Sequence, residues 1–163
     1  MKAVICTELG HPKLLEIKDV EIPKPSEDEV LIKVEAAGVN YPDALLVQGK
    51  YQIVVNPPFT PGNEVCGYIE KVGKNVNLTK GMKVIGLPEI GGLSEYVSVN
   101  KNLVIPISDK ITSLAGASLP INYGTSYYAL KRRAQASKGE SLLVLGGSGG
   151  IGTASIQLGN ILG

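Results

Sequence analysis

The chain of 163 residues is poor in the side chains that bind metals or act as nucleophiles. It has two cysteines and a single histidine, and neither Cys6 nor Cys66 belongs to a CxxC pair or to another spacing typical of a metal site. His11 follows Gly10 in a predicted turn, with no serine or cysteine nucleophile motif near it in the sequence. These shortages argue against a metalloprotein and against a Ser–His or Cys–His hydrolase. Two small buried thiols in a reducing compartment are the simplest interpretation.

Strong charge of either sign and long apolar runs are also missing. Sixteen basic residues against fifteen acidic ones leave a net charge of +1, which is too small to attract nucleic acid or a membrane surface. No apolar stretch approaches the ~20 residues that cross a bilayer. The strand-like residues 2–7 follow Met1 directly, which leaves no room for a signal peptide. We therefore expect a cytoplasmic protein that binds neither membrane nor nucleic acid.

The first hundred residues do contain short β-like runs separated by glycine and proline. The 20 glycines and 10 prolines, placed mostly between these runs, predict a mainly β, partly closed barrel. One helix is expected at residues 40–48, because Pro42 suits a first turn, Asp43 favours the positive end of the helix dipole and Gly49 suits a left-handed C-cap. The predicted strands are 2–7, 14–20, 29–37, 65–72, 83–86, 94–99 and 103–106.

Beyond residue 110 the pattern becomes helical. Helices are expected at 112–117 and 119–134, and an apolar strand at 141–145 runs into a glycine-rich turn and a helix at 153–162. This order is typical of a dinucleotide phosphate site, in which glycines let the backbone approach the pyrophosphate and the helix N-terminus supplies amide donors. We expect a β-rich domain at 1–110, a helical connector at 111–139 and the first βα unit of a Rossmann domain at 140–163. A lone βα unit cannot cover both faces of its strand, so these last residues should be poorly stable.

Seven segments, in this order along the chain, carry a resemblance to a known family: AAGVNYPD, GKY, PFTPGNE, GYIEKVG, GMKVIG, YGTSY and GGIG. Together they resemble the zinc-independent quinone oxidoreductase branch, the zeta-crystallin group, of the medium-chain dehydrogenase/reductase superfamily. The resemblance implies a GroES-like β domain followed by a Rossmann domain that is cut just after it begins. It also implies a homodimer for the whole protein, whereas the 163-residue fragment is expected to be monomeric.

The same resemblance bears on metal content. In zinc-dependent relatives a cysteine stands at the position of Asn40 and a histidine at the position of Asn63, while Glu64 keeps the acidic position that follows. Neutral amides are poor Zn²⁺ ligands compared with thiolate and imidazole. The resemblance therefore implies zinc-free transfer of a hydride from NADPH, with NADH not excluded, to a quinone or an α,β-unsaturated carbonyl compound.

Site residues follow from the resemblance, each beside a plainer interpretation. Tyr51 would donate to the substrate carbonyl beside the nicotinamide, or simply close the mouth of the barrel. Asn40 would bond the nicotinamide ribose or a substrate oxygen, or cap its helix. Thr125 would bond the nicotinamide carboxamide, or only pack its helix.

The pyrophosphate would lie on Gly146, Gly149, Gly150, Ile151 and Gly152. An alternative from a different functional class remains open at this point. The chain could be a non-catalytic truncated product or an interaction module that binds no cofactor.

Overall fold

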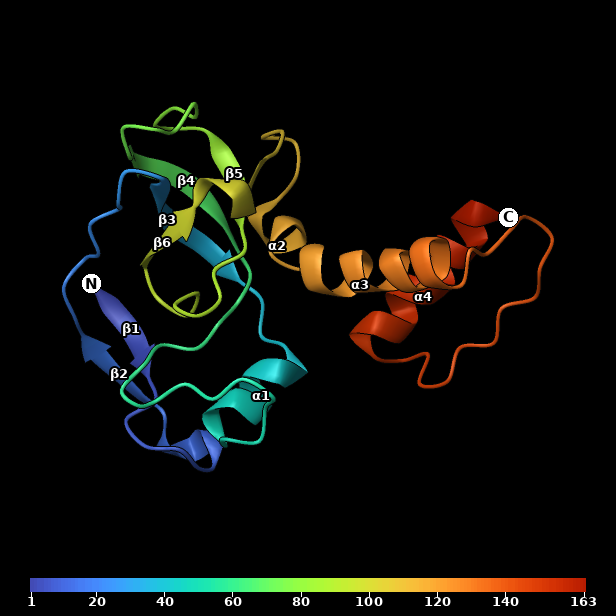
Figure 1. Cartoon of the computed structure of the whole chain (residues 1–163), viewed down its shortest axis with the longest axis horizontal. Coiled ribbons are helices and arrows are strands. Elements are labelled where there is room, and N and C mark those ends of the chain that lie inside the picture. Colours follow the sequence, from blue (N-terminus) through green and yellow to red (C-terminus); the bar gives the residue numbers. More distant parts are fainter. The chain divides into compact units, whose positions relative to one another are not determined.

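The computed structural model describes residues 1–163, and the chain divides into two compact units, Met1–Ala117 and Ser118–Gly163. Figure 1 shows the first unit as a β-rich body and the second as a group of helices. The first unit extends to Ala117 because the short helix α2 (Ser113–Gly116) packs on two of its strands, β3 and β4.

The first unit contains a five-stranded antiparallel sheet in the order β6-β3-β4-β5-β7 and a separate two-stranded pair, β1-β2. The mainly β prediction is therefore confirmed, but the sheet does not close into a barrel, since β6 and β7 are its two edges. Isolated bridges between Ala3 and Ser94 and between Cys6 and Phe59 tie the β1 segment to the rest of the unit. The strands are β1 (Lys2–Ile5), β2 (Glu16–Asp19), β3 (Glu29–Ala37), β4 (Val65–Val72), β5 (Lys83–Gly86), β6 (Tyr96–Asn100) and β7 (Val104–Pro106). Short 3-10 helices cover Pro12–Leu14 and Lys101–Leu103.

The largest hydrophobic cluster of this unit lies on one face of the five-stranded sheet. β-branched residues suit this face because their side chains pack well on a pleated surface. Ile32 on β3 and Val65 on β4 are fully buried, and Gly67 brings the two strands together because a Cβ there would overlap the carbonyl oxygen of Lys33. The buried cluster comprises Val30, Ile32, Val65, Ile69, Val84, Val97, Val99 and Val104.

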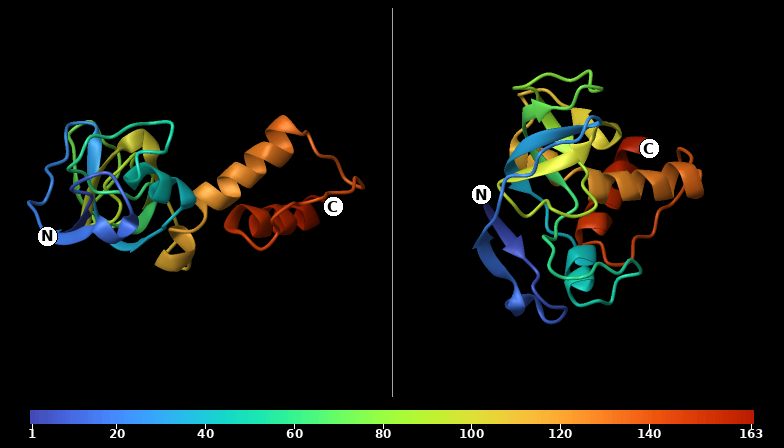
Figure 2. Two further views of the ribbon diagram at one scale, coloured as in Figure 1. Left: turned by 90° about the horizontal axis from the view of Figure 1, so that it is seen from below. Right: turned by 60° about the vertical axis from the view of Figure 1, so that its left-hand side comes forward.

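The ends of β3 and β4 bring two distant stretches of sequence side by side. Ala37 pairs with Val65, and the amide of Gly38 donates to the carbonyl oxygen of Glu64 at 3.0 Å. Residues 38–40 therefore lie beside residues 62–64. Helix α1 (Tyr41–Val47) follows at once. Figure 1 and the right-hand view of Figure 2 both place α1 at the same end of the unit as the β1-β2 pair, away from the turn between β4 and β5.

Helix α1 confirms the helix predicted at 40–48. Asn40 occupies the N-cap position, and the backbone beyond the helix turns at Gly49, whose φ of 65° is the left-handed conformation expected there. Asp43 is buried: its Oδ2 accepts from the amide of Asn40 at 2.8 Å and its Oδ1 accepts from the amide of Gly62 at 3.1 Å. One carboxyl group therefore fastens the start of α1 to the segment that leads into β4.

Both cysteines are free and buried, as the sequence predicted. Burial raises the pKa of the Cys6 thiol, and it also raises the pKa of the Cys66 thiol. Because a thiolate is the reactive form of cysteine, both side chains act as small apolar residues at neutral pH.

The second unit is helical. Pro120–Arg133 winds continuously, with π-helical turns at Pro120–Gly124 and Tyr128–Arg133 on either side of α3 (Thr125–Tyr127). Helix α4 (Gly150–Leu162) packs against α3. The long helix predicted at 119–134 is thus present, and the last helix begins at Gly150 instead of residue 153. None of the helices combines the length and the apolar character that a membrane crossing requires.

The strand predicted at 141–145 does not form. Residues 141–144 have no regular secondary structure, and Leu143 and Leu145 are 83% and 87% exposed. A strand exists only when a neighbouring strand accepts and donates its backbone hydrogen bonds, and no other strand lies in this unit. The apolar sequence is suited to a buried parallel strand, but nothing here pairs with it.

We expect Ile32→Ala to lower the free energy of unfolding of the first unit by about 2–5 kcal/mol, because it leaves a cavity in a fully buried site. Urea unfolding followed by far-UV circular dichroism measures this change. The matched control is Ile17→Ala, at a position that is 73% exposed, which should alter stability by less than about 0.5 kcal/mol. Equal effects of the two substitutions would contradict the position of the core.

Asp43→Asn should destabilise the protein by about 1–3 kcal/mol at acidic pH, since its NH₂ group cannot accept from the Asn40 or Gly62 amide that it would face. Burial raises the pKa of Asp43, so the folded state holds this proton more tightly than the unfolded state does. The contribution of protonation to stability is complete below the unfolded pKa of about 4 and is lost as the pH rises through the folded pKa.

The wild type should therefore exceed Asp43→Asn in free energy of unfolding by less and less as the pH rises from 4 to 7. Urea unfolding at several pH values tests this trend. The exposed substitution Asp109→Asn serves as the control and should show no such trend. An advantage that grows towards neutral pH would contradict a raised pKa for Asp43.

Candidate functional site

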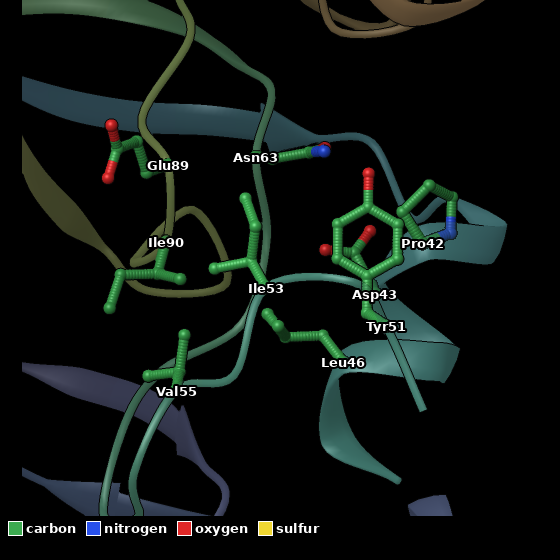
Figure 3. A pocket seen from close by; sticks show the side chains of 9 residues that line it. All are labelled: Pro42, Asp43, Leu46, Tyr51, Ile53, Val55, Asn63, Glu89 and Ile90. Atoms are coloured by element: carbon green, nitrogen blue, oxygen red, sulfur yellow. The ribbon is translucent and has the colours of Figure 1, made fainter. Parts of the chain in front are cut away.

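A pocket of about 110 Å³ opens beside α1 in the first unit. Its volume is comparable to that of cavities that hold one benzene molecule, about 150 Å³. Figure 3 shows the hydroxyl group of Tyr51 and the amide of Asn63 at one end of the pocket, with Leu46, Val55 and Ile90 at the other. The full lining is Pro42, Asp43, Leu46, Tyr51, Ile53, Val55, Asn63, Glu89 and Ile90. An apolar chamber with few polar groups at one end is typical of a small-molecule site.

The position of Tyr51 is compatible with both interpretations of the sequence, a donor to the substrate and an aromatic ring that closes the mouth of the β domain. Its ring packs against a buried cluster that includes Cys6, Leu46 and Phe59, so the aromatic body is half-buried. Its hydroxyl group points into the polar end of the pocket (Figure 3). The core therefore fixes the ring and leaves the O–H group available as a donor.

Asn40, Asn63 and Glu64 form one hydrogen-bonded group beside this pocket. The Nδ2 atom of Asn40 donates to Glu64 Oε1 at 2.7 Å and to Asn63 Oδ1 at 3.3 Å. Glu64 is 1% exposed, and Gly38 leaves the room for it, since a Cβ at Gly38 would lie 2.6 Å from Glu64 Cγ. The side chain of Asn40 thus turns towards β4, although its backbone occupies the N-cap position of α1.

The structure and the sequence interpretation disagree about which residue reaches the pocket. Asn63 lines it and Asn40 does not, because Asn40 spends both of its N–H groups on Glu64 and Asn63. Sequence reasoning also missed Glu89 and Ile90, which come from an irregular loop after β5 that has no periodic pattern to mark it. The carboxylate of Glu89 points away from Tyr51 in Figure 3.

These residues do not fit a metal ion. The chain holds no group of three or more His, Cys, Asp or Glu side chains placed to bind one. At the positions of Asn40 and Asn63 the amides bond to each other and to Glu64 instead of presenting oxygens to a shared centre. Zn²⁺ favours thiolate and imidazole ligands, so we derive no catalytic step through a metal.

The second unit contains the glycine-rich turn predicted to hold a pyrophosphate. Gly146 has a φ of 76°, and a Cβ at Gly152 would lie 2.7 Å from Gly147 Cα, so the turn folds tightly on itself. Gly149 is the N-cap of α4, with no side-chain cap and no acidic residue in the first turn. The amides of Gly150 and Ile151 therefore form an uncapped helix N-terminus, which suits an anionic group.

Polar residues of the preceding helix support this turn. Ser126 is fully buried: its Oγ donates to the carbonyl oxygen of Ile151 at 3.1 Å and accepts from Ser155 Oγ at 3.1 Å. Asn122 packs against Gly150, where a Cβ would lie 2.5 Å from its Oδ1. Thr125 is exposed and makes no side-chain hydrogen bond. Sequence reasoning selected Thr125 and missed Asn122 and Ser126, whose spacing of four along one helix face was the available signal.

Comparison with known proteins agrees with this geometry. Residues 26–109 match the alcohol dehydrogenase GroES-like domain. The human quinone oxidoreductase is 39% identical over 161 residues, which cover 97% of this chain and 49% of that protein. The chain therefore spans about half the length of this relative.

Two solved structures extend the comparison. A probable oxidoreductase from Mycobacterium abscessus is 38% identical with a TM-score of 0.96, and the match covers 100% of this chain and 53% of that one. The quinone oxidoreductase of Thermus thermophilus, solved also in complex with NADPH, is 38% identical with a TM-score of 0.88 and coverages of 100% and 51%. The chain therefore belongs to the alcohol dehydrogenase GroES-like domain family, and the relatives that it resembles include quinone oxidoreductases.

Proposed function

We propose that this chain supplies the substrate pocket and the pyrophosphate-binding turn of a zinc-free, NADPH-dependent reductase of quinones or α,β-unsaturated carbonyl compounds. The observation that carries the proposal is the bonded pair of amides, Asn40 and Asn63, at the positions where zinc-dependent relatives have metal ligands. The names of the relatives and the NADPH complex of the Thermus thermophilus protein support the same assignment.

Conjugated carbonyl compounds suit a site that has hydrogen-bond donors in place of a Lewis acid. When such a compound takes up a hydride, the negative charge spreads over several atoms and reaches the carbonyl oxygen. Alcohol oxidation through a zinc alkoxide fits less well, because the donor set here is unsuited to a metal. The largely apolar walls of the pocket, formed by residues such as Leu46 and Ile90, suit a neutral ring or alkene.

The cofactor would be held by the second unit. The amides at the N-terminus of α4 would bind the pyrophosphate, and Gly146, Gly149 and Gly152 would let it approach the backbone closely. We also propose that Thr125, whose hydroxyl group is exposed, bonds the nicotinamide carboxamide. When bound, NADPH would supply the hydride.

Tyr51 is the proposed acid of the first unit. The substrate gains two electrons with the hydride, and its carbonyl oxygen then needs a proton, which the phenol can donate and recover from solvent. Asn40 has both N–H groups engaged but keeps its Oδ1 as an acceptor, which suits a ribose hydroxyl group. A carbonyl oxygen needs a donor, so Asn40 serves the substrate only through its neighbours.

Tyr51→Phe should lower kcat for an enone or quinone by roughly 10²-fold, because it removes the proposed acid and keeps the ring in place. The steady-state rate of NADPH oxidation measures this loss. The assay uses the whole protein encoded by the gene. The control is Tyr41→Phe, at a position that is 76% exposed. Unchanged kcat in Tyr51→Phe would exclude the acid role, and an inactive wild type would refute the proposed function itself.

Gly152→Ala should weaken NADPH binding by roughly tenfold or more. The new Cβ would push against Gly146 and Gly147 and move amides whose hydrogen bonds to a charged group contribute about 1.5–3 kcal/mol each. Titration with NADPH, followed by nicotinamide fluorescence, measures the dissociation constant. Gly124→Ala is the matched control, because a Cβ there meets no atom within 4 Å. Saturable binding of equal strength in both variants would argue against this turn as the pyrophosphate site, and no binding by the wild type would favour a non-catalytic role.

A further inference from the structure

The hydrogen bonds of the Asn40–Asn63–Glu64 group determine which atoms remain free to meet a substrate. Asn40 Nδ2 donates to Glu64 Oε1 at 2.7 Å and to Asn63 Oδ1 at 3.3 Å. An amide nitrogen carries two hydrogens, so Asn40 has no donor left. Both hydrogen bonds therefore start at Asn40, and both Glu64 and Asn63 accept from it.

Asn63 is oriented by this arrangement. Its Oδ1 accepts from Asn40, so its Nδ2, on the other branch of the planar amide, faces away from Asn40. Asn63 lines the pocket, and Figure 3 shows its amide and the hydroxyl group of Tyr51 at the same end. The Nδ2 hydrogens of Asn63 donate to neither Asn40 nor Glu64, so they are available to a molecule in the pocket.

We propose that Asn63 Nδ2 donates a hydrogen bond to the carbonyl oxygen of the substrate, and that Asn40 is the positioning residue that aims it. This inference rests on the proposed function. The hydride forms a C–H bond on the conjugated carbon, the π electron pair moves to the carbonyl oxygen, and Asn63 stabilises that oxygen until Tyr51 protonates it. The donor is preorganised, because Glu64 is buried and fixes Asn40, and Asn40 fixes Asn63.

The amide pair thus provides a function that differs in kind from that of a metal ligand. A ligand presents a lone pair to a cation, whereas Asn63 presents N–H hydrogens to a developing anion. Because the charge on the oxygen is greatest after hydride transfer begins, this hydrogen bond strengthens along the reaction and should act mainly on kcat.

The test compares Asn63→Leu with Asn63→Gln and with the control Asn77→Leu in the protein as encoded. Asn63→Leu has a similar shape without hydrogen-bonding atoms, Asn63→Gln keeps the amide, and Asn77 is an exposed residue in the turn between β4 and β5. For an enone or quinone, kcat should fall about 10²-fold in Asn63→Leu with a smaller change in KM. Asn63→Gln should recover at least part of that loss, and Asn77→Leu should match the wild type.

Two further measurements separate a catalytic role from a structural one. The thermal midpoint and the NADPH dissociation constant of Asn63→Leu should stay close to the wild-type values. A kcat within twofold of the wild type in Asn63→Leu, or a loss that Asn63→Gln shares in full, would overturn the inference while the proposed function stands. A wild type that reduces no quinone or enone would overturn both.

Discussion

The buried carboxylate of Glu64 is the constraint on which the arrangement of the candidate site depends. A carboxyl group that is 1% exposed must be hydrogen-bonded, and Asn40 meets part of that need. The side chain fits only because residue 38 is a glycine, next to the point where β3 and β4 stop pairing. The same local geometry directs the chain into α1, which forms one wall of the pocket. Asp43 then joins the start of this helix to Gly62.

A hydrogen-bonded group of amides has different chemical consequences from a metal site built on the same framework. Asn40 donates to both Glu64 and Asn63, so the Asn63 oxygen is occupied and its N–H hydrogens remain for the pocket. The polar end of the pocket therefore offers donors, the Asn63 amide and the Tyr51 hydroxyl group, opposite apolar side chains. Such a site distinguishes an acceptor oxygen on a conjugated framework from a group that requires a Lewis acid.

The sequence predicted short-range features correctly and failed where distant segments must meet. The strands of the five-stranded sheet and helix α1 were predicted well, since alternating apolar residues, Pro42 and Gly49 act over a few neighbours. The strand expected at 141–145 was wrong, and the sheet of the expected partly closed barrel stays open, because a strand and a closed sheet both require pairing with distant segments. Tyr51 was predicted to lie at a site and lines a pocket, whereas the place of Asn63 in that pocket was not foreseen.

The sequence by itself determined the family, the β-rich first unit and the glycine turn, because these depend on ordered local patterns that can be recognised one segment at a time. Only the tertiary structure decided that Asn63 faces the pocket, that Asn40 is saturated by two acceptors and that Ser126 and Asn122 support the α4 N-terminus. These features depend on where separate side chains meet and on how many donors each has left. Hydrogen-bond direction is a property of a packed neighbourhood, and a linear pattern does not contain it.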